Sequence, residues 1–238
     1  MLVRAFLLIS LVFGLNQAAQ ATATPALCQK IFAGDSKKSA NLIPGSLQSQ
    51  PRVIIISAPS GAGKSTLMGL LTSEFPNSFG FSVSTTTRAP RGTEKDGVEY
   101  HFTNVADFEE RINKGEFIEY AKVHGNFYGT SRAAVEQILK SGRSVILDVD
   151  VQGAAVVRKA LPGQTVSIFI SPENLIVLEQ RLRARKTDTE EAIQKRMKNA
   201  TEELKHAPEY DTEIVNADLA AAYARFKGYL IALPPLAH

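Results

Sequence analysis

The chain has 238 residues, enough for one sizeable α/β domain plus an appendage, and its 44% hydrophobic and 21% charged residues are those of an ordinary globular protein. This composition excludes a disordered or fibrous chain, and a net charge of +3 is too small to argue for nucleic-acid binding. The single cysteine, Cys28, excludes an internal disulfide and a cysteine-rich metal site, and the four histidines include no ligand-spaced pair, which argues against zinc.

The first fifty residues differ from the rest of the chain. Arg4 is followed by an almost wholly apolar run, Ala5–Leu15, and then by small and polar residues with Ala-Gln-Ala at Ala19–Ala21. This order predicts a cleaved secretory signal over residues 1–21, followed by a linker over 24–50. An organelle presequence, which should carry more arginine, and an extension outside the working protein are the alternatives. The last agrees best with downstream motifs that need ATP, so a cytoplasmic location is expected from the chemistry.

A strand, a glycine-containing loop and a helix then follow one another. Val53–Ile56 is a continuous apolar run, typical of a strand buried on both faces of a parallel sheet. Thr66–Leu71 continues as an amphipathic helix. Between them, Ala58–Ser65 has the sequence Ala-Pro-Ser-Gly-Ala-Gly-Lys-Ser, and this context predicts a phosphate-binding loop for ATP.

The chemistry of such a loop explains its residue types. Glycines let successive backbone N–H groups approach phosphate oxygens, Lys64 can reach the β- and γ-phosphates, and the Ser65 hydroxyl can ligate Mg²⁺. The usual pattern begins with glycine where this chain has Ala58, and the cost depends on whether that position needs a positive φ. The predicted ATP contacts in the loop are Ala58, Pro59, Ser60, Gly61, Ala62, Gly63, Lys64, Ser65 and Thr66.

Two arginines further along the chain indicate a site for a phosphorylated acceptor. Phe81–Ser84 alternates and predicts a short strand. Threonines then lead into Arg88 and Arg91, with Pro90 stiffening the turn between them. Two guanidiniums so close together suit a dianionic phosphate, whereas the alternative is a pair of solvated surface arginines.

Six motif blocks, in order, resemble the guanylate kinase family. They are Ser84–Arg91, Asp96–Phe102, Glu116–Tyr120, Gly125–Thr130, Ile146–Gly153 and Arg181–Arg185. The likeness covers about residues 51–230, and bacterial members of the family also begin the phosphate loop with alanine. It implies a guanylate kinase-like domain over 51–238, with a three-layer α/β P-loop fold and a parallel sheet core. A GMP-binding insert is expected at about 84–135 and a lid at about 177–207.

The resemblance also implies which side chains bind GMP. Those expected to hold the phosphate are Arg88, Arg91, Tyr100 and Tyr128. Those expected to recognise guanine are Ser84, Glu119 and Thr130. The physical chemistry agrees, because a carboxylate such as Glu119 accepts from guanine N1–H and N2–H₂, and adenine lacks both donors. Buried polar groups reject a ligand that leaves them unpaired.

Two acids follow a second buried-strand pattern. Ser144–Val149 predicts a strand with Asp148 and Asp150 at its carboxyl end, where α/β sheets bind ligands. An acid at this position suits Mg²⁺. The resemblance implies that Asp148 lies near the metal, together with Ser65, and that Asp150 lies near the guanine amine. The alternative for Asp150 is a cap on the following helix.

The segment Leu178–Arg196 is strongly basic. Arg181 and Arg185 share a helix face by their spacing, whereas Arg183 and Lys195 are expected to be solvated. The resemblance implies a lid that closes over ATP, excludes water and neutralises charge on the transferring phosphoryl group. The catalytic residues expected are Lys64, Arg88, Asp148, Arg181, Arg185 and Arg196.

The end of the chain predicts a last strand and a terminal helix. Thr212–Asn216 fits the strand, with Asn216 expected beside adenine, and Ala217–Leu230 fits a helix whose apolar residues belong to the core.

The predicted reaction is the phosphorylation of GMP to GDP by ATP with Mg²⁺, with dGMP as a further candidate acceptor. The expected partners are the small molecules ATP and GMP. Neither nucleic acid nor a stable membrane association is expected, and a homo-oligomer is left open. A catalytically silent binding module of the same family is one alternative, but Lys64, Ser65, Asp148 and Asp150 are all present. A kinase acting on a phosphorylated sugar is the other, and it would need neither Glu119 nor Ser84.

Overall fold

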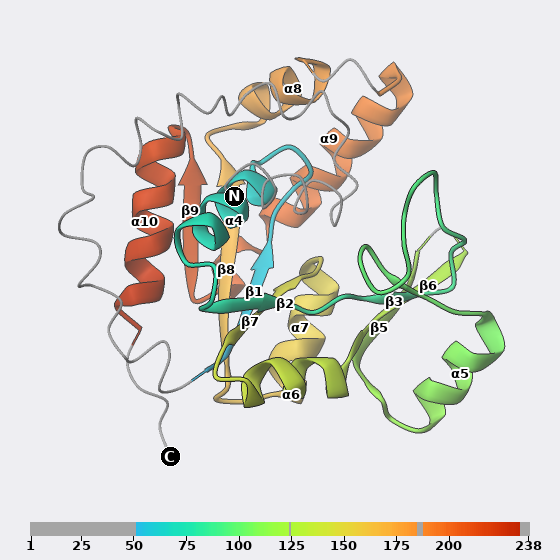
Figure 1. Cartoon of the computed structure of the whole chain (residues 1–238). Coiled ribbons are helices and arrows are strands. Elements are labelled where there is room, and N and C mark those ends of the chain that lie inside the picture. Colours follow the sequence, from blue (N-terminus) through green and yellow to red (C-terminus); the bar gives the residue numbers. More distant parts are fainter. Residues whose placement is uncertain (1–50, 124, 185–187, 234–238) are drawn as a thin grey trace.

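A computed structural model describes residues 51–123, 125–184 and 188–233 (Figure 1). The predictions for residues 1–50 and for Arg185 lie outside the described residues. The central element is a parallel five-stranded sheet in the order β2-β7-β1-β8-β9. Its strands are β1 (Val53–Ser57), β2 (Phe79–Phe81), β7 (Ser144–Asp148), β8 (Thr165–Pro172) and β9 (Thr212–Asn216).

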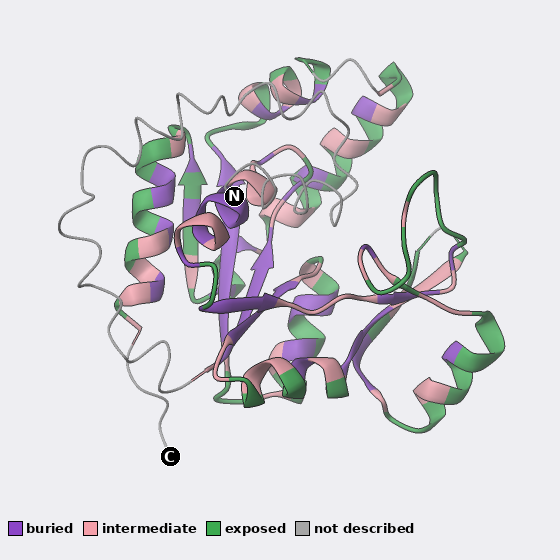
Figure 2. Cartoon of the chain, viewed as in Figure 1, coloured by how far each residue is buried: buried purple, intermediate pink, exposed green. Residues whose placement is uncertain are grey.

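Helices cover both faces of this sheet, because alternate residues of each strand point to opposite sides. Ile54 and Ile56 of β1 pack in one core cluster with α4 and α10, whereas Val53 and Ile55 pack in a second cluster with α6 and α7. Figure 2 shows the three inner strands, β7, β1 and β8, as almost wholly buried between these layers. The three-layer α/β fold predicted from the sequence is therefore confirmed. The covering helices are α4 (Lys64–Glu74), α6 (Arg132–Lys140), α7 (Val151–Ala160) and α10 (Leu219–Ile231).

The strand predicted at Phe81–Ser84 is wrong in its bounds. Strand β2 is Phe79–Phe81, and it pairs with β7 in a register that ends at Phe81 opposite Ile146. Residues 82–84 carry the chain from the first sheet to the second and are not in a strand. Their alternation of serine and valine therefore does not reflect sheet pairing. The strands predicted at Val53–Ile56, Ser144–Val149 and Thr212–Asn216 are confirmed to within a residue at each end.

A second, four-stranded sheet in the order β4-β3-β6-β5 lies beside the first (Figure 1). Strand β3 runs parallel to β4 and antiparallel to β6, and β6 is antiparallel to β5. The elements are β3 (Thr85–Thr86), β4 (His101–Phe102), β5 (Phe117–Val123), β6 (Asn126–Ser131) and helix α5 (Val105–Asn113).

This second sheet has a small aromatic core of its own. Phe108 of α5 is fully buried and stacks on Phe117 at 4.4 Å and on Phe127 at 5.2 Å between ring centroids. Gly129 of β6 leaves room for two of these rings, since a Cβ there would lie 2.9 Å from the Phe117 ring and 3.0 Å from the Phe108 ring. Because Gly129 has no side chain, strand β6, which also carries Thr130, packs directly against the stacked rings.

Two further helices, α8 (Leu175–Ala184) and α9 (Glu190–Leu204), cross near the phosphate loop and enclose a small cluster of Leu178, Leu182 and Ala200. A short 3₁₀ helix, η3 (Ala207–Glu209), follows them. Among the described residues, no helix is both long and apolar enough to cross a bilayer.

Candidate active site

The loop between β1 and α4 has the backbone conformation that phosphate binding requires. Gly61 and Gly63 have positive φ values of 99° and 96°, a region that other residues adopt only with strain. Side chains of α8 close over Gly61, where a Cβ would lie 3.0 Å from Leu178 and 3.1 Å from Leu182. The loop is therefore shaped by its glycines and held from the side by α8.

Asn216, at the end of β9, holds the phosphate loop in place through a side-chain hydrogen bond to its backbone. It is buried, and its side-chain amide donates to the Ala62 carbonyl at 2.8 Å. A Cβ on Gly63 would lie 2.2 Å from the Asn216 Nδ2 atom, so only glycine fits there. The observed contacts of Asn216 are with the loop backbone, and its place beside adenine stays a prediction.

Lys64 and Asp148 form an ion pair at the carboxyl ends of two adjacent strands. The register of β1 with β7 sets Ile56 opposite Asp148, which brings the carboxylate to the start of the loop. The Ser57 hydroxyl donates to the Val149 carbonyl at 2.7 Å and fixes the two strand ends together. Lys64 thus has an internal counter-ion at the position where phosphate charge would compete for it.

Ser65 and Asp148 offer a hydroxyl and a carboxylate oxygen, the kind of hard donors that Mg²⁺ takes from a protein. Within the described residues, no group of three or more His, Cys, Asp or Glu side chains could hold a metal alone. The fit is therefore to a cation that also takes phosphate oxygens and water, as Mg²⁺ does in nucleotide sites.

A cavity of about 120 Å³ opens beside this ion pair, and its polar lining includes Lys64, Asp148, Asp150 and Glu203. Glu203 comes from helix α9 and was not recognised in the sequence, where it is one acid among several in a charged helix. Burial raises the pKa of Glu203; Lys64 lowers it and Asp150 raises it further. The cavity thus brings one lysine together with three carboxylates.

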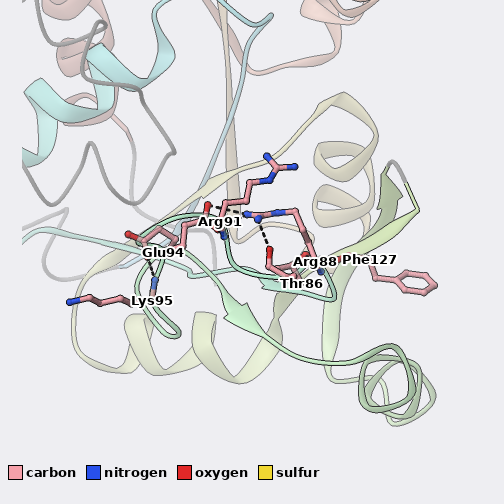
Figure 3. A network of polar contacts seen from close by, with 8 residues as sticks. Thr86, Arg88, Arg91, Glu94, Lys95 and Phe127 are labelled. Carbon is pink, nitrogen blue, oxygen red and sulfur yellow. Dashed lines mark hydrogen bonds and ion pairs between the residues drawn. The ribbon is translucent and has the colours of Figure 1, made fainter. Parts of the chain in front are cut away.

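Arg88 lies in a network with Glu94 at the edge of the second sheet (Figure 3). Arg88 Nη2 donates to both carboxylate oxygens of Glu94, at 3.0 and 2.9 Å, and the backbone N–H of Arg91 donates to the same carboxylate at 2.8 Å. Against the effect of burial, this pairing raises the pKa of Arg88 and lowers that of Glu94. The predicted phosphate-binding arginine is therefore buried and paired, whereas the Arg91 side chain is exposed.

Two tyrosines flank this arginine. The Arg88 guanidinium lies 5.3 Å from the centre of the Tyr100 ring, and the Tyr100 and Tyr128 rings meet edge to face at 5.9 Å. Burial raises the pKa of Tyr100, so its hydroxyl stays a hydrogen-bond donor at neutral pH. Arg88, Tyr100 and Tyr128 thus lie together, and their binding of a phosphate stays a prediction. Glu94 joins them as a residue that the sequence did not single out.

Glu119 and Thr130 lie opposite each other in the second sheet, and Ser84 directly precedes strand β3 of the same sheet. Glu119 pairs with Thr130 in the β5–β6 register, and the β3–β6 register, if continued by one residue, sets Ser84 opposite Thr130. The Thr130 hydroxyl donates to Glu119 Oε1 at 2.5 Å. Burial raises the pKa of Glu119, the Thr130 hydrogen bond lowers it and Asp150 raises it. Glu119 is a buried acid, and no basic side chain among residues 51–123, 125–184 and 188–233 forms an ion pair with it.

Asp150 lies between Glu119 of the second sheet and Lys64 of the phosphate loop. Its carboxylate caps helix α7 by accepting from the Gly153 N–H at 2.8 Å, so the capping interpretation is confirmed. A Cβ on Gly153 would lie 3.4 Å from both the Asp150 carboxylate and Glu119 Oε2. Since Asp150 also lines the cavity beside Lys64, one helix N-terminus separates the two halves of the candidate site.

Two of the three predicted lid arginines contact the loop or its support. Arg196 Nη1 of α9 donates to the Ser60 hydroxyl at 2.5 Å, and Arg181 Nη2 of α8 donates to the Asn216 carbonyl at 2.9 Å. The third, Arg185, lies outside the described residues. Arg183 is exposed and ion-paired with Glu179 and Glu190, which confirms that it is a surface residue.

The family model described as guanylate kinase matches residues 50–233 of the chain. The chain is 52% identical over 180 residues to guanylate kinase 1 of Oryza sativa subsp. japonica, covering 74% of this chain and 47% of that one. It is 44% identical over 180 residues to guanylate kinase of Campylobacter jejuni, covering 76% of this chain and 88% of that one.

Among solved structures, the crystal structure of guanylate kinase from Anaplasma phagocytophilum matches with a TM-score of 0.59 at 34% identity. The match covers 77% of this chain and 86% of that one. Guanylate kinase 1 of Arabidopsis thaliana is 49% identical over 188 residues, which are 78% of this chain and 48% of that one. The chain thus spans about half the length of the plant relatives that it matches.

Proposed function

Since the chain belongs to the guanylate kinase family, we propose that it transfers the γ-phosphoryl group of ATP to GMP and produces ADP and GDP. The second sheet would bind GMP as an insert over about 84–135, and α8 and α9 would form the lid over about 177–207. Both would belong to one kinase domain over 51–238, acting in the cytoplasm, where ATP is available.

The observation that carries this proposal is the position of Asp150 between two kinds of site. On one side it lines the cavity that holds Lys64 and Asp148. On the other side it adjoins Glu119 across the first turn of α7. A phosphate donor at the loop and an acceptor whose base lies at Glu119 would then occupy neighbouring sites, so that the acceptor phosphate could reach the γ-phosphate, as phosphoryl transfer between two nucleotides demands.

GMP would be recognised at both of its ends. Buried Glu119 would accept from guanine N1–H and N2–H₂, and the Ser84 hydroxyl would donate to O6. The Thr130 hydroxyl would join it at O6 after releasing Glu119 Oε1, to which it donates in the structure. The phosphate would meet Arg88 and Arg91 together with the tyrosine hydroxyls of Tyr100 and Tyr128. Because Glu94 already holds Arg88, the phosphate would compete with an internal carboxylate for the guanidinium.

The transfer step needs positioning and charge neutralisation more than covalent help from the protein. A GMP phosphate oxygen forms a bond to the γ-phosphorus as the bond to the bridging oxygen of ADP breaks, and the anionic attacking oxygen requires no general base. Lys64 would exchange Asp148 for the phosphates, and Arg181, Arg185 and Arg196 would offset developing charge. Ser65 and Asp148 would hold Mg²⁺, which supplies further charge neutralisation when bound.

A coupled assay of ADP release by the full chain tests the proposal with GMP, dGMP and AMP as acceptors. We expect turnover with GMP, little with AMP, and a rate with dGMP that reports whether the 2′-hydroxyl is needed. Absence of turnover with GMP would rule the proposal out, and equal rates with GMP and AMP would rule out base recognition by Glu119.

A further inference from the structure

Helix α9 places two oppositely charged side chains near the phosphate loop, Arg196 and, about two helical turns later, Glu203. Arg196 donates to the Ser60 hydroxyl at the outer side of the loop. Glu203 follows about two turns later on the same face, because a helix returns to one direction after seven residues. Ala200, one turn after Arg196, is buried at 1% exposure, so this face is the packed one. Figure 1 shows α9 lying next to the loop that follows β1.

Glu203 is aimed at the inside of the cavity and not at solvent. It is partly buried and lines the cavity together with Lys64, Asp148 and Asp150. Its neighbour Glu202 is exposed and pairs with Lys205 at 2.7 Å on the solvent side. The two adjacent acids of α9 therefore have opposite environments.

The cavity is short of positive charge for a polyanion. Among the residues that the structure describes, its lining carries one cation, Lys64, which Asp148 already pairs, and two further carboxylates, Asp150 and Glu203. The acids do not form a set that could hold a metal directly. Bare ATP entering this space would meet net negative charge, whereas ATP neutralised by a divalent cation would meet much less repulsion.

We propose that Glu203 makes nucleotide binding depend on the metal, by disfavouring metal-free ATP through its charge while tolerating Mg²⁺-bound ATP. This inference rests on the proposed function and assigns the discrimination to a residue of the lid helix. Glu203 thus acts as a specificity-determining residue, and its charge beside the loop favours the form of ATP whose charge is already neutralised.

Binding measurements with and without metal test this role. The dissociation constant of ATP is measured by calorimetry once in EDTA and once in excess Mg²⁺. The ratio of the value in EDTA to the value in Mg²⁺ is then compared between the wild-type chain and Glu203→Gln. We expect the ratio to fall about fivefold in the variant, because metal-free ATP binds more tightly once one nearby like charge is removed. Glu202→Gln removes the same charge from the exposed face and should leave the ratio unchanged.

A structural role alone would change both dissociation constants by the same factor, and an unchanged ratio in Glu203→Gln would overturn the proposal. Glu203→Ala removes the same charge without adding an amide. Thermal unfolding shows which of the two neutral variants keeps a cooperative fold, and the ratio measured for that variant decides the result. Glu203→Asp keeps the charge and should keep the wild-type ratio. Turnover of GMP by the wild-type chain is measured in parallel, so failure of the proposed reaction is distinguished from failure of the role of Glu203.

Discussion

The two halves of the candidate site are built in different ways. On the first sheet, the phosphate loop is made of backbone, with two glycines at positive φ and Asn216 bonded to the Ala62 carbonyl. On the second sheet, the proposed GMP side is made of side chains that pair with one another, Arg88 with Glu94 and Thr130 with Glu119. Backbone shape should therefore control binding in the donor half of the site, and side-chain charge should control binding in the acceptor half.

The largest effect should come from changing the backbone position that Asn216 abuts. Gly63→Ala adds a Cβ 2.2 Å from Asn216 Nδ2 at a φ of 96°. Because strain and clash both oppose the loop conformation, we expect kcat/KM for ATP to fall by at least about 100-fold. Gly228→Ala in α10 is the control, since a Cβ there meets nothing within 4 Å. If GMP affinity fell by the same factor, the two halves would not be separable.

The next effect should be confined to the acceptor half. Glu119→Gln replaces an acceptor of two guanine hydrogen bonds by a group that accepts only at one atom. We expect GMP affinity, measured by calorimetry, to fall about 10- to 100-fold with ATP affinity unchanged. Glu110→Gln makes the same charge change on the exposed face of α5 and should have no effect. Equal losses for GMP and ATP would contradict the guanine-binding role.

A smaller effect tests whether Glu94 competes with the substrate phosphate. In Glu94→Gln, Arg88 loses its carboxylate partner, so the free energy of unfolding should fall by about 1–2 kcal/mol. The freed guanidinium should bind GMP about threefold more tightly, because no internal anion has to be displaced. Weaker GMP binding would instead indicate that Glu94 orients Arg88 for the phosphate.

The smallest effect concerns pH, and it has opposite signs for the two acids. The pKa of Glu94 is lowered in the folded protein, so its ionised form stabilises the fold above its unfolded pKa of about 4.3, and this contribution is lost as the pH falls through the lowered value. The pKa of Glu119 is raised by burial, so its ionisation opposes folding, and stability falls as the pH rises from about 4.3 through the raised value.

At pH 7, Glu94→Gln should therefore lower the melting temperature, and Glu119→Gln should raise the free energy of unfolding by up to about 1 kcal/mol. The Glu119→Gln difference should shrink as the pH falls through the raised pKa of Glu119 and be gone by about pH 4, whereas the Glu94→Gln difference should shrink only below about pH 4.3, as the pH falls towards the lowered pKa of Glu94. Thermal unfolding followed by circular dichroism between pH 3.5 and 8 measures this, on the range suggested by ordinary carboxyl pKa values of about 4. A Glu119→Gln variant that is less stable than the wild type at pH 7 would refute the assigned cost of the buried charge.

The sequence predicted the parts that depend on local pattern. The buried strand at Val53–Ile56 and the glycine loop after it are recognisable because apolar run, glycines and helix are contiguous. Arg88 was singled out by its closeness to Arg91 in the chain, and Glu119 through the family resemblance; the structure then showed Glu94 and Thr130 as their partners. The strand predicted at Phe81–Ser84 was misplaced because the alternation of apolar and polar residues does not show where pairing with β7 ends.

Glu94 and Glu203 could not be found in this way, because each gains its meaning from a distant neighbour. Glu94 is one polar residue in a polar turn until Arg88 folds back onto it. Glu203 resembles Glu202 beside it, and only the packed face of α9 distinguishes the two. A side chain whose role is set by tertiary contact leaves no periodic or spacing signal in the chain.

Gly129 shows how a mutational scan of this chain could be misinterpreted. The residue contacts no proposed ligand group, yet any side chain there would strike the rings of Phe117 and Phe108. Relief of that collision would shift the adjoining Thr130 hydroxyl away from Glu119. Variants at residue 129 should therefore lose selectivity for the nucleobase. The cause, however, would be a steric clash in the aromatic core behind the binding surface and not the loss of a ligand contact.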